Sequence, residues 1–143
     1  MSYWIFKCNP SLYRLADRMA DVSDNKVSWK VAQHGDEIGP GDAAFIWQTG
    51  KDRGIYGMVQ IEDSPHEFSA NERKDRFSRV PETDDYGVMT TITNRKIRLS
   101  HKLLRSTPGL EKLSVLQGGR IQMGTNFSVT LDEAKILLSL MPD

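Results

Sequence analysis

The chain has 143 residues, of which 38% are hydrophobic and 27% are charged. This length fits a single domain over residues 1–143 and excludes a second full domain, while the apolar share is sufficient for one buried core. No run of about 18 apolar residues is present, and Lys7 and Pro10 interrupt the N-terminus before a signal-peptide core could form. We therefore expect a cytoplasmic globular protein that contacts no membrane.

The content of metal-binding residues is low. The single cysteine, Cys8, excludes an internal disulfide framework and every zinc site that needs two or more thiolates. The three histidines do not supply a ligand set of their own. We expect no metal and no other cofactor.

Acidic and basic residues balance at 19 each, but they are distributed unevenly. Residues 1–85 contain 15 acids and 11 Lys or Arg, whereas residues 86–143 contain 4 acids and 8 Lys or Arg. The balance argues against a protein that coats nucleic acid by electrostatics alone, because such proteins carry a large positive excess. Contact with a polyanion must be local, and the acid-free stretch 86–110 is the best candidate for it.

The first third of the chain predicts a strand, a helix and a long loop. Residues 3–7 (YWIFK) have strand composition, and Asn9-Pro10 can cap and begin a helix. Apolar residues recur at helical spacing up to Met19, so we expect a helix from Pro10 to Ala20. The following polar, Gly-rich segment, residues 22–42, is predicted to be a long loop with at most a short strand or turn, and Trp29 lies within it.

The middle of the chain is predicted to be mainly β. Residues 43–49 and 55–62 have strand composition and are separated by a Gly-containing turn, which is typical of a hairpin. Residues 63–85 are charged and contain two prolines, so we expect a long excursion with at most a short helix at 70–77. Residues 86–99 are predicted to form one long or two short strands.

The C-terminal third returns to short helices. Residues 103–116 predict one or two helical turns, and a brief strand is expected at 120–123. Thr130 and Glu133 have the spacing of a capping box, which predicts a helix from residue 130 onward. Strands mixed with peripheral helices indicate a compact α+β sheet or barrel, in which residues 3–7, 43–49, 55–62 and 86–99 pair into one curved sheet.

Patterns associated with catalysis are weak. Residues 39–44 (GPGDAA) match a dinucleotide-binding pattern, but they precede a strand, whereas that pattern must follow one and open a helix. Lys7 with Cys8, or His34 beside two acids, can be explained as ordinary strand-end and loop residues. No nucleophile and base pair stands out, so we assign no catalytic residue.

Two tryptophans are better candidates for ligand binding. Trp29 lies among polar residues, and Trp47 is followed by Gln48 and Thr49. Trp4 lies in an apolar strand run and is predicted to be core. A tryptophan that opens onto a cleft can stack a flat ligand such as a nucleobase, with about 1 to 3 kcal/mol of stacking energy per base.

Several motifs together resemble the EVE domain, a member of the PUA-like superfamily related to YTH and ASCH domains. They are the opening YWIFKCNP, Trp29, Gly41-Asp42 leading to Phe45-Ile46-Trp47, Gly54-Ile55-Tyr56-Gly57, and residues 123–130 (MGTNFSVT) before a helix. The resemblance spans nearly the whole chain. It departs from the usual pattern at Cys8, where Ser is more common, and in the lack of any tryptophan after Trp47.

The resemblance implies a PUA-like fold, a small partly open β-barrel with peripheral helices, that binds a nucleobase, often a modified one such as a methylated base. By analogy, Trp29 forms one wall of the pocket, and Trp47 or another aromatic residue forms a second. Cys8, Thr49 and Asn126 are the implied polar contacts. The candidate phosphate contacts are Lys51, Arg53, Arg95, Arg98 and Lys102.

Other functions remain open at this point. The domain can be an RNA-binding PUA-like module that assists RNA modification, or an amidohydrolase resembling ASCH enzymes that acts on modified nucleosides. The enzyme would need Lys7 or another lysine beside an activated hydroxyl and a carboxylate. A further alternative is an interaction module with an unused pocket. We expect the partner to be DNA or RNA carrying a modified base, with a possible partner protein from a modification or restriction system.

Overall fold

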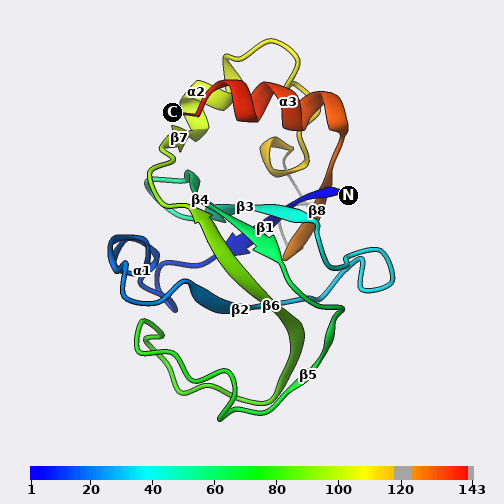
Figure 1. The fold of residues 1–143 in the computed structure, drawn as a ribbon. Coiled ribbons are helices and arrows are strands. Elements are labelled where there is room, and N and C mark those ends of the chain that lie inside the picture. The colour runs from blue at the N-terminus through cyan, green and yellow to red at the C-terminus, as the bar shows by residue number, and fades with distance from the viewer. Residues whose placement is uncertain (118–123, 142–143) are drawn as a thin grey trace.

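A computed structural model describes residues 1–117 and 124–141, and the strands in this part of the chain form one mixed eight-stranded sheet. The main path of the sheet has the order β2-β6-β4-β3-β1-β8 and does not close into a complete barrel (Figure 1). The strands are β1 (Tyr3–Cys8), β2 (Lys26–Lys30), β3 (Ala43–Gln48), β4 (Gly54–Ile61), β5 (His66–Phe68), β6 (Asp85–Asn94), β7 (Leu99–Ser100) and β8 (Asn126–Val129).

Short helices surround the sheet. They are α1 (Leu15–Ala20), α2 (His101–Arg105), the 3-10 turn η1 (Ser114–Leu116) and α3 (Leu131–Ser139). In Figure 1, α2 and α3 lie together on one side of the sheet, and α1 lies on the opposite side beside β2. None of the described helices is long and apolar enough to cross a membrane.

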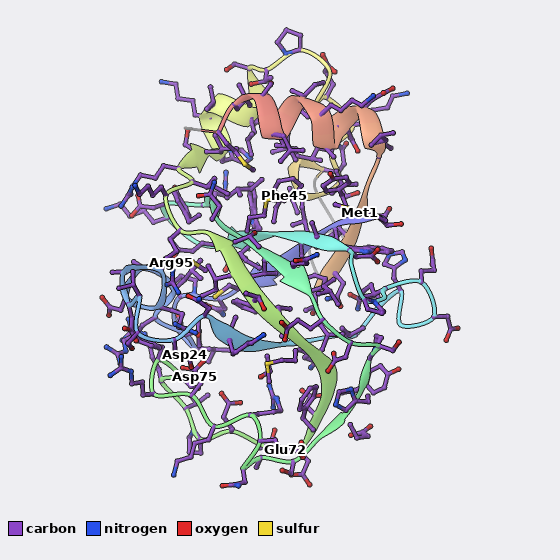
Figure 2. All side chains as sticks on the ribbon, viewed as in Figure 1. Met1, Asp24, Phe45, Glu72, Asp75 and Arg95 are labelled. Carbon is purple, nitrogen blue, oxygen red and sulfur yellow. The ribbon has the colours of Figure 1, made fainter. Side chains whose placement is uncertain are left out.

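The sheet separates two hydrophobic clusters, and strand alternation assigns residues to them. Trp4, Phe6 and Cys8 of β1 belong to the first cluster, whereas Ile5 belongs to the second. Successive side chains of a strand point to opposite faces, so this two-residue period is expected. Phe45 of β3 also belongs to the second cluster, and Figure 2 shows it between the sheet and α3.

Side chains, rather than strand pairing, connect the two ends of the sheet. The Asn126 side chain in β8 accepts hydrogen bonds from the backbone N–H groups of Ala32 and Gln33, at 2.7 and 3.2 Å, and donates to the Lys30 carbonyl at 3.0 Å. In return, the Gln33 side chain accepts from the N–H groups of Thr125 and Asn126. These bonds join the edge strands β2 and β8.

A buried carboxylate accounts for the Gly41-Asp42 motif. Asp42 accepts hydrogen bonds from the Ser2 N–H at 2.8 Å, the Trp4 indole at 2.9 Å and the Gly39 N–H at 3.0 Å. Gly41 has a φ of 89°, which an L-residue rarely adopts. The motif is therefore a turn that ties the N-terminus to the start of β3, as its position before a strand predicts.

Most of the predicted elements are confirmed. Strand β1 and the hairpin of β3 and β4 occur where they were expected, and all four predicted strand segments lie in the same sheet. The capping box is also present, because the Thr130 side chain accepts from the Glu133 N–H at 3.1 Å and the Glu133 carboxylate accepts from the Thr130 N–H at 3.0 Å. Residues 86–99 form two strands, β6 and β7.

Two predictions were wrong in detail. The first helix begins at Leu15 rather than Pro10, because Tyr13 bridges to Ser78 and the Arg14 N–H bonds the Phe77 carbonyl. Trp29 lies on strand β2 rather than in a loop, since its segment pairs with β6. The excursion after β4 contains β5 and turns, and no helix forms at 70–77, where the sequence allowed at most a short one. The strand expected at 120–123 lies outside the described residues.

We predict that Asn126→Ala destabilises the fold by about 1 to 3 kcal/mol, because the truncation leaves polar backbone groups without their partner. The free energy of unfolding in urea measures this loss. Asn71→Ala is the matched control, since Asn71 is exposed. Equal stability of the two variants would show that Asn126 does not connect the sheet edges.

Candidate functional site

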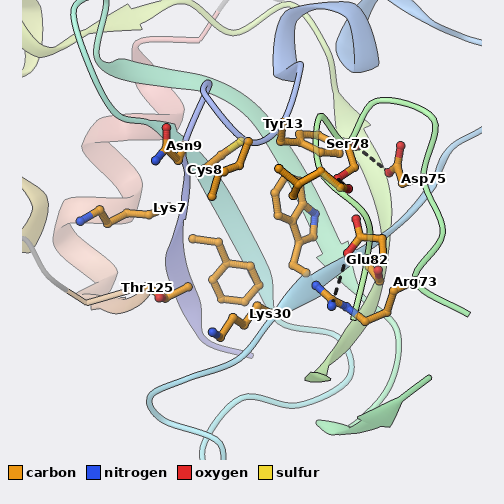
Figure 3. A pocket seen from close by; sticks show the side chains of 15 residues that line it. Lys7, Cys8, Asn9, Tyr13, Lys30, Arg73, Asp75, Ser78, Glu82 and Thr125 are labelled. Atoms are coloured by element: carbon orange, nitrogen blue, oxygen red, sulfur yellow. Dashed lines mark hydrogen bonds and ion pairs between the residues drawn. The ribbon is translucent and has the colours of Figure 1, made fainter. Parts of the chain in front are cut away.

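The first candidate site is a hollow of about 230 Å³ between β1, β2 and the excursion that follows β4 (Figure 3). Its lining combines aromatic, apolar and charged side chains. The lining residues are Phe6, Lys7, Cys8, Asn9, Leu12, Tyr13, Ser28, Trp29, Lys30, Arg73, Asp75, Ser78, Val80, Glu82 and Thr125. We call this hollow the Trp29 pocket.

Trp29 and Tyr13 form an aromatic corner in this pocket. Their ring centroids are 5.7 Å apart, and the rings meet at 65°, an edge-to-face arrangement. Trp29 is 9% exposed, and its indole N–H has no acceptor among the described residues. A buried donor without a partner costs about 1 to 3 kcal/mol, so the fold leaves one indole donor unused in a residue that lines the pocket.

The position of Tyr13 is fixed by Asp75. The Tyr13 hydroxyl donates to the Asp75 carboxylate at 2.8 Å, a contact drawn in Figure 3. Burial and the negative charge of Asp75 raise the pKa of Tyr13 well above its usual range. The hydroxyl therefore stays protonated at neutral pH and keeps donating to Asp75.

The excursion supplies a charged wall. Arg73 forms a salt bridge with Glu82 at 3.3 Å and donates to the Thr83 carbonyl at 2.6 Å. Lys30 of β2 lies 3.7 Å from Asp85, at the start of β6. These pairs place donors and acceptors at the rim of the aromatic corner. Sequence reasoning missed this wall because a charged excursion is typical of a solvated surface, and nothing local showed that it folds over β2.

Cys8 lines the pocket as an un-ionised thiol. It is buried, and burial raises its pKa to about 12. A thiolate is the reactive form of cysteine, so this side chain is poorly suited to nucleophilic chemistry. It can contact a ligand only as a small, weakly polar group.

Trp47 and Thr49 lie in a different hollow from Trp29. They line a second hollow of about 160 Å³, together with Lys7, Gly50, Arg53, His101, Val115 and Phe127. Trp47 belongs to the second hydrophobic cluster, whereas Trp29 belongs to the first. The second aromatic wall of the Trp29 pocket is Tyr13, which the sequence analysis did not single out. Lys7 lines both hollows.

Two other predicted contacts are engaged in the fold. Asn126 is 2% exposed, and its side chain forms the bonds between β8 and β2 described above. The Arg95 guanidinium donates to the carbonyls of Arg18, Met19, Asp21 and Asp24 and to the Asn25 side chain. Figure 2 marks Arg95 and Asp24 on the same side of the molecule. Its donors hold the end of α1 and the turn after it.

Of the remaining predicted phosphate contacts, three lie together and the fourth lies in a neighbouring hollow. Lys51, Arg53 and Lys102 line one open hollow of about 380 Å³ beside the start of α2. Arg98 lies in a neighbouring hollow of about 480 Å³ with Arg95. No cluster of three or more His, Cys, Asp or Glu side chains that could hold a metal ion occurs in the described part of the chain.

Comparisons with known proteins agree with this architecture. The model of the EVE domain matches residues 2–140. A crystal structure from Pseudomonas putida has 17% identity and a TM-score of 0.70, covering 97% of this chain and 99% of that chain. Human THYN1, solved in complex with 5-methylcytosine-containing DNA, has 16% identity and a TM-score of 0.66, covering 98% of this chain and 97% of that chain.

A third similar structure is a mutant of ZmASCH from Zymomonas mobilis, with 13% identity and a TM-score of 0.60, covering 99% of this chain and 97% of that chain. At these identities the likeness shows the fold alone. The search among curated proteins finds no match to the sequence. The described fold is therefore PUA-like.

We predict that Trp29→Ala destabilises the protein by about 3 to 5 kcal/mol, because the side chain is buried in the first cluster. The loop expected from the sequence would have made this truncation mild. Thermal and urea unfolding measure the effect, with Trp4→Ala, another buried tryptophan of the same cluster, as the comparison. A Trp29→Ala variant as stable as the wild type would contradict its place in the core.

We also predict that native Cys8 resists alkylation by iodoacetamide at pH 8, because little thiolate is present when the pKa is about 12. The native rate should be at least about a hundredfold lower than that of the urea-unfolded protein, in which the thiol regains its ordinary pKa. Mass spectrometry of the labelled chain measures both rates. Similar rates would show that Cys8 is accessible and ionised.

Proposed function

Because the chain belongs to the EVE-domain family, we propose that it binds nucleic acid and captures a single modified base in the Trp29 pocket. The observation that carries this proposal is the corner of Trp29 and Tyr13, with a buried indole N–H that has no acceptor among the described residues. A nucleobase offers a flat face that stacks on an aromatic ring and edge groups that form hydrogen bonds.

The size of the pocket supports a single-base ligand. Its volume of about 230 Å³ is below the range of roughly 300 to 1,000 Å³ that is usual for drug-sized ligands. A base must therefore enter alone, from a single strand or after rotation out of a duplex. Unstacking and unpairing cost a few kcal/mol, which contacts in the pocket and to the phosphates must offset.

The lining can favour a methylated base. Phe6, Leu12 and Val80 provide apolar surface in the pocket, and burial of one methyl group contributes up to about 0.8 kcal/mol. That amount biases the choice of base without enforcing it. Polar groups of the excursion, above all Arg73 and Glu82, stand where the edge of a base can be recognised by hydrogen bonds.

The complex of the structurally similar human THYN1 with 5-methylcytosine-containing DNA favours DNA as the first partner to test. RNA presents the same stacking surfaces, so RNA with a modified base belongs in the same experiment. The similarity to ZmASCH keeps an amidohydrolase as the second candidate. Among the described residues, Lys7 forms no salt bridge, and no hydrogen bond joins its ammonium group to a hydroxyl or carboxylate, so the geometry favours binding over catalysis.

The proposal predicts that Trp29→Leu loses about 1 to 3 kcal/mol of affinity for an oligonucleotide with the preferred modified base, because the stacking surface is removed while part of the apolar volume is kept. Fluorescence anisotropy with single-stranded and duplex DNA and RNA, each with one modified or unmodified base, measures this loss. Trp4→Leu is the matched control, since Trp4 is buried in the same cluster but does not line the pocket.

A second pair of variants avoids the core. Val80 lines the pocket and is 45% exposed, so Val80→Trp should block the entrance and abolish the preference for the modified base. Val22→Trp, at a 77% exposed position outside the pocket, should leave the preference unchanged. A folded Val80→Trp variant with full preference would overturn the proposal, as would release of a hydrolysed product from modified nucleosides by the pure protein.

A further inference from the structure

We propose that the second hollow, which is lined by Lys7, Arg53 and His101, binds the phosphate next to the captured base. This inference rests on the proposed function, since it places the flanking backbone of the same strand. It also assigns the hollow beside Trp47 to the binding of phosphate rather than to base stacking.

The charge of the hollow is the first argument. Three of its lining residues carry basic side chains and none carries a carboxylate. No salt bridge in the described part of the chain involves Lys7, Arg53 or His101. Lys7 and Arg53 are cations that repel each other, and an anion in the hollow relieves that repulsion.

The walls of the hollow hold these groups in place. The Lys7 ammonium lies 5.8 Å from the centre of the Phe127 ring, and the His101 ring meets the Trp47 ring edge-to-face at 6.0 Å. Burial lowers the pKa of Lys7, and it also lowers the pKa of His101, with Arg53 and Arg105 adding to that effect. Partial removal from water strengthens the attraction of Lys7 and Arg53 for a phosphate, while the lowered pKa of His101 leaves a neutral ring that can donate one N–H.

The position of the hollow is the second argument. Lys7 lines both this hollow and the Trp29 pocket, so the two sites share a wall at the end of β1. In Figure 3, Lys7 extends away from Arg73 and Glu82, which lie on the other side of the pocket. A nucleotide whose base occupies the Trp29 pocket would thus have a basic hollow beside it for its phosphate.

The hollow also continues into a third basic surface. Gly50, Arg53 and His101 line both it and the open hollow that carries Lys51 and Lys102, where Asp52 is the one acid among the lining residues. A strand that leaves the Trp29 pocket past Lys7 would therefore meet basic side chains in both hollows. Phosphate contacts of this kind set affinity and register without recognising the base.

The test replaces single phosphates. In a single-stranded oligonucleotide with one preferred modified base, each linkage on either side of that base is changed to a neutral methylphosphonate. For the wild type we expect a loss of roughly tenfold in affinity at one adjacent linkage and a salt slope smaller by about 0.7. The variant Arg53→Gln/His101→Gln should bind about tenfold more weakly, and the same methylphosphonate should cause it no further loss.

The matched control is Lys112→Gln/Lys135→Gln, at two exposed positions that line none of these hollows. The methylphosphonate linkage should reduce the affinity of this control variant as much as it reduces that of the wild type. The ratio of affinities for modified and unmodified sequences should be unchanged in Arg53→Gln/His101→Gln. The phosphate site would be contradicted if Arg53→Gln/His101→Gln no longer preferred the modified sequence but still bound the methylphosphonate oligonucleotide more weakly than the unsubstituted one. If the wild type bound modified and unmodified sequences equally, the base pocket alone would be contradicted.

A final measurement distinguishes a backbone phosphate from a free one. Inorganic phosphate is titrated into the protein while the His101 ring is followed by NMR. We expect its binding to be at least about a hundredfold weaker than that of the oligonucleotide, because a single ion lacks the base contacts. Equal affinity, or insensitivity of every linkage to methylphosphonate substitution, would overturn the proposal.

Discussion

The hydrogen bonds between Asn126 and the end of β2 hold the two edges of the sheet together, and the Trp29 pocket depends on them. Strand pairing leaves β2 and β8 as the open edges of the sheet, and one buried amide joins them through three backbone groups. Since Trp29 lies one residue before Lys30, whose carbonyl accepts one of these bonds, the closure also fixes the tryptophan beside β1. The pocket depends on a polar contact that lies outside it, in the same way that outer groups orient the ligands of a metal.

Alternation along β1 explains why the two candidate sites are separate and adjacent. Phe6 and Cys8 point to the first hydrophobic cluster, where the Trp29 pocket lies, and Lys7 between them reaches the hollow of Trp47 as well. A two-residue period makes neighbouring residues of one strand serve opposite faces. The end of β1 can therefore serve a base on one side and a phosphate on the other without any change in backbone conformation.

The parts of this fold that sequence predicts are those with local causes. The hairpin of β3 and β4 follows from composition and a Gly-containing turn, and the helix after Thr130 follows from its capping box. Trp29 was assigned to a loop because its partner strand β6 lies about 60 residues away, although Val27, Trp29 and Val31 already alternated. Arg95 could not be assigned from composition, since its acceptors are backbone carbonyls after α1 that only tertiary structure brings near.

The division between pocket and basic hollows is compatible with a formal net charge of zero. A protein that gathers its cations at a few hollows can contact phosphates locally, while acids elsewhere weaken binding to nucleic acid in general. Within the Trp29 pocket, Arg73 is paired with Glu82, so this wall adds hydrogen-bonding groups with little net charge. Affinity would then come mainly from the side of Lys7, Arg53 and His101, and preference for a base from the side of Trp29 and Tyr13. Substitutions on the two sides should for that reason change different measurements of the same complex.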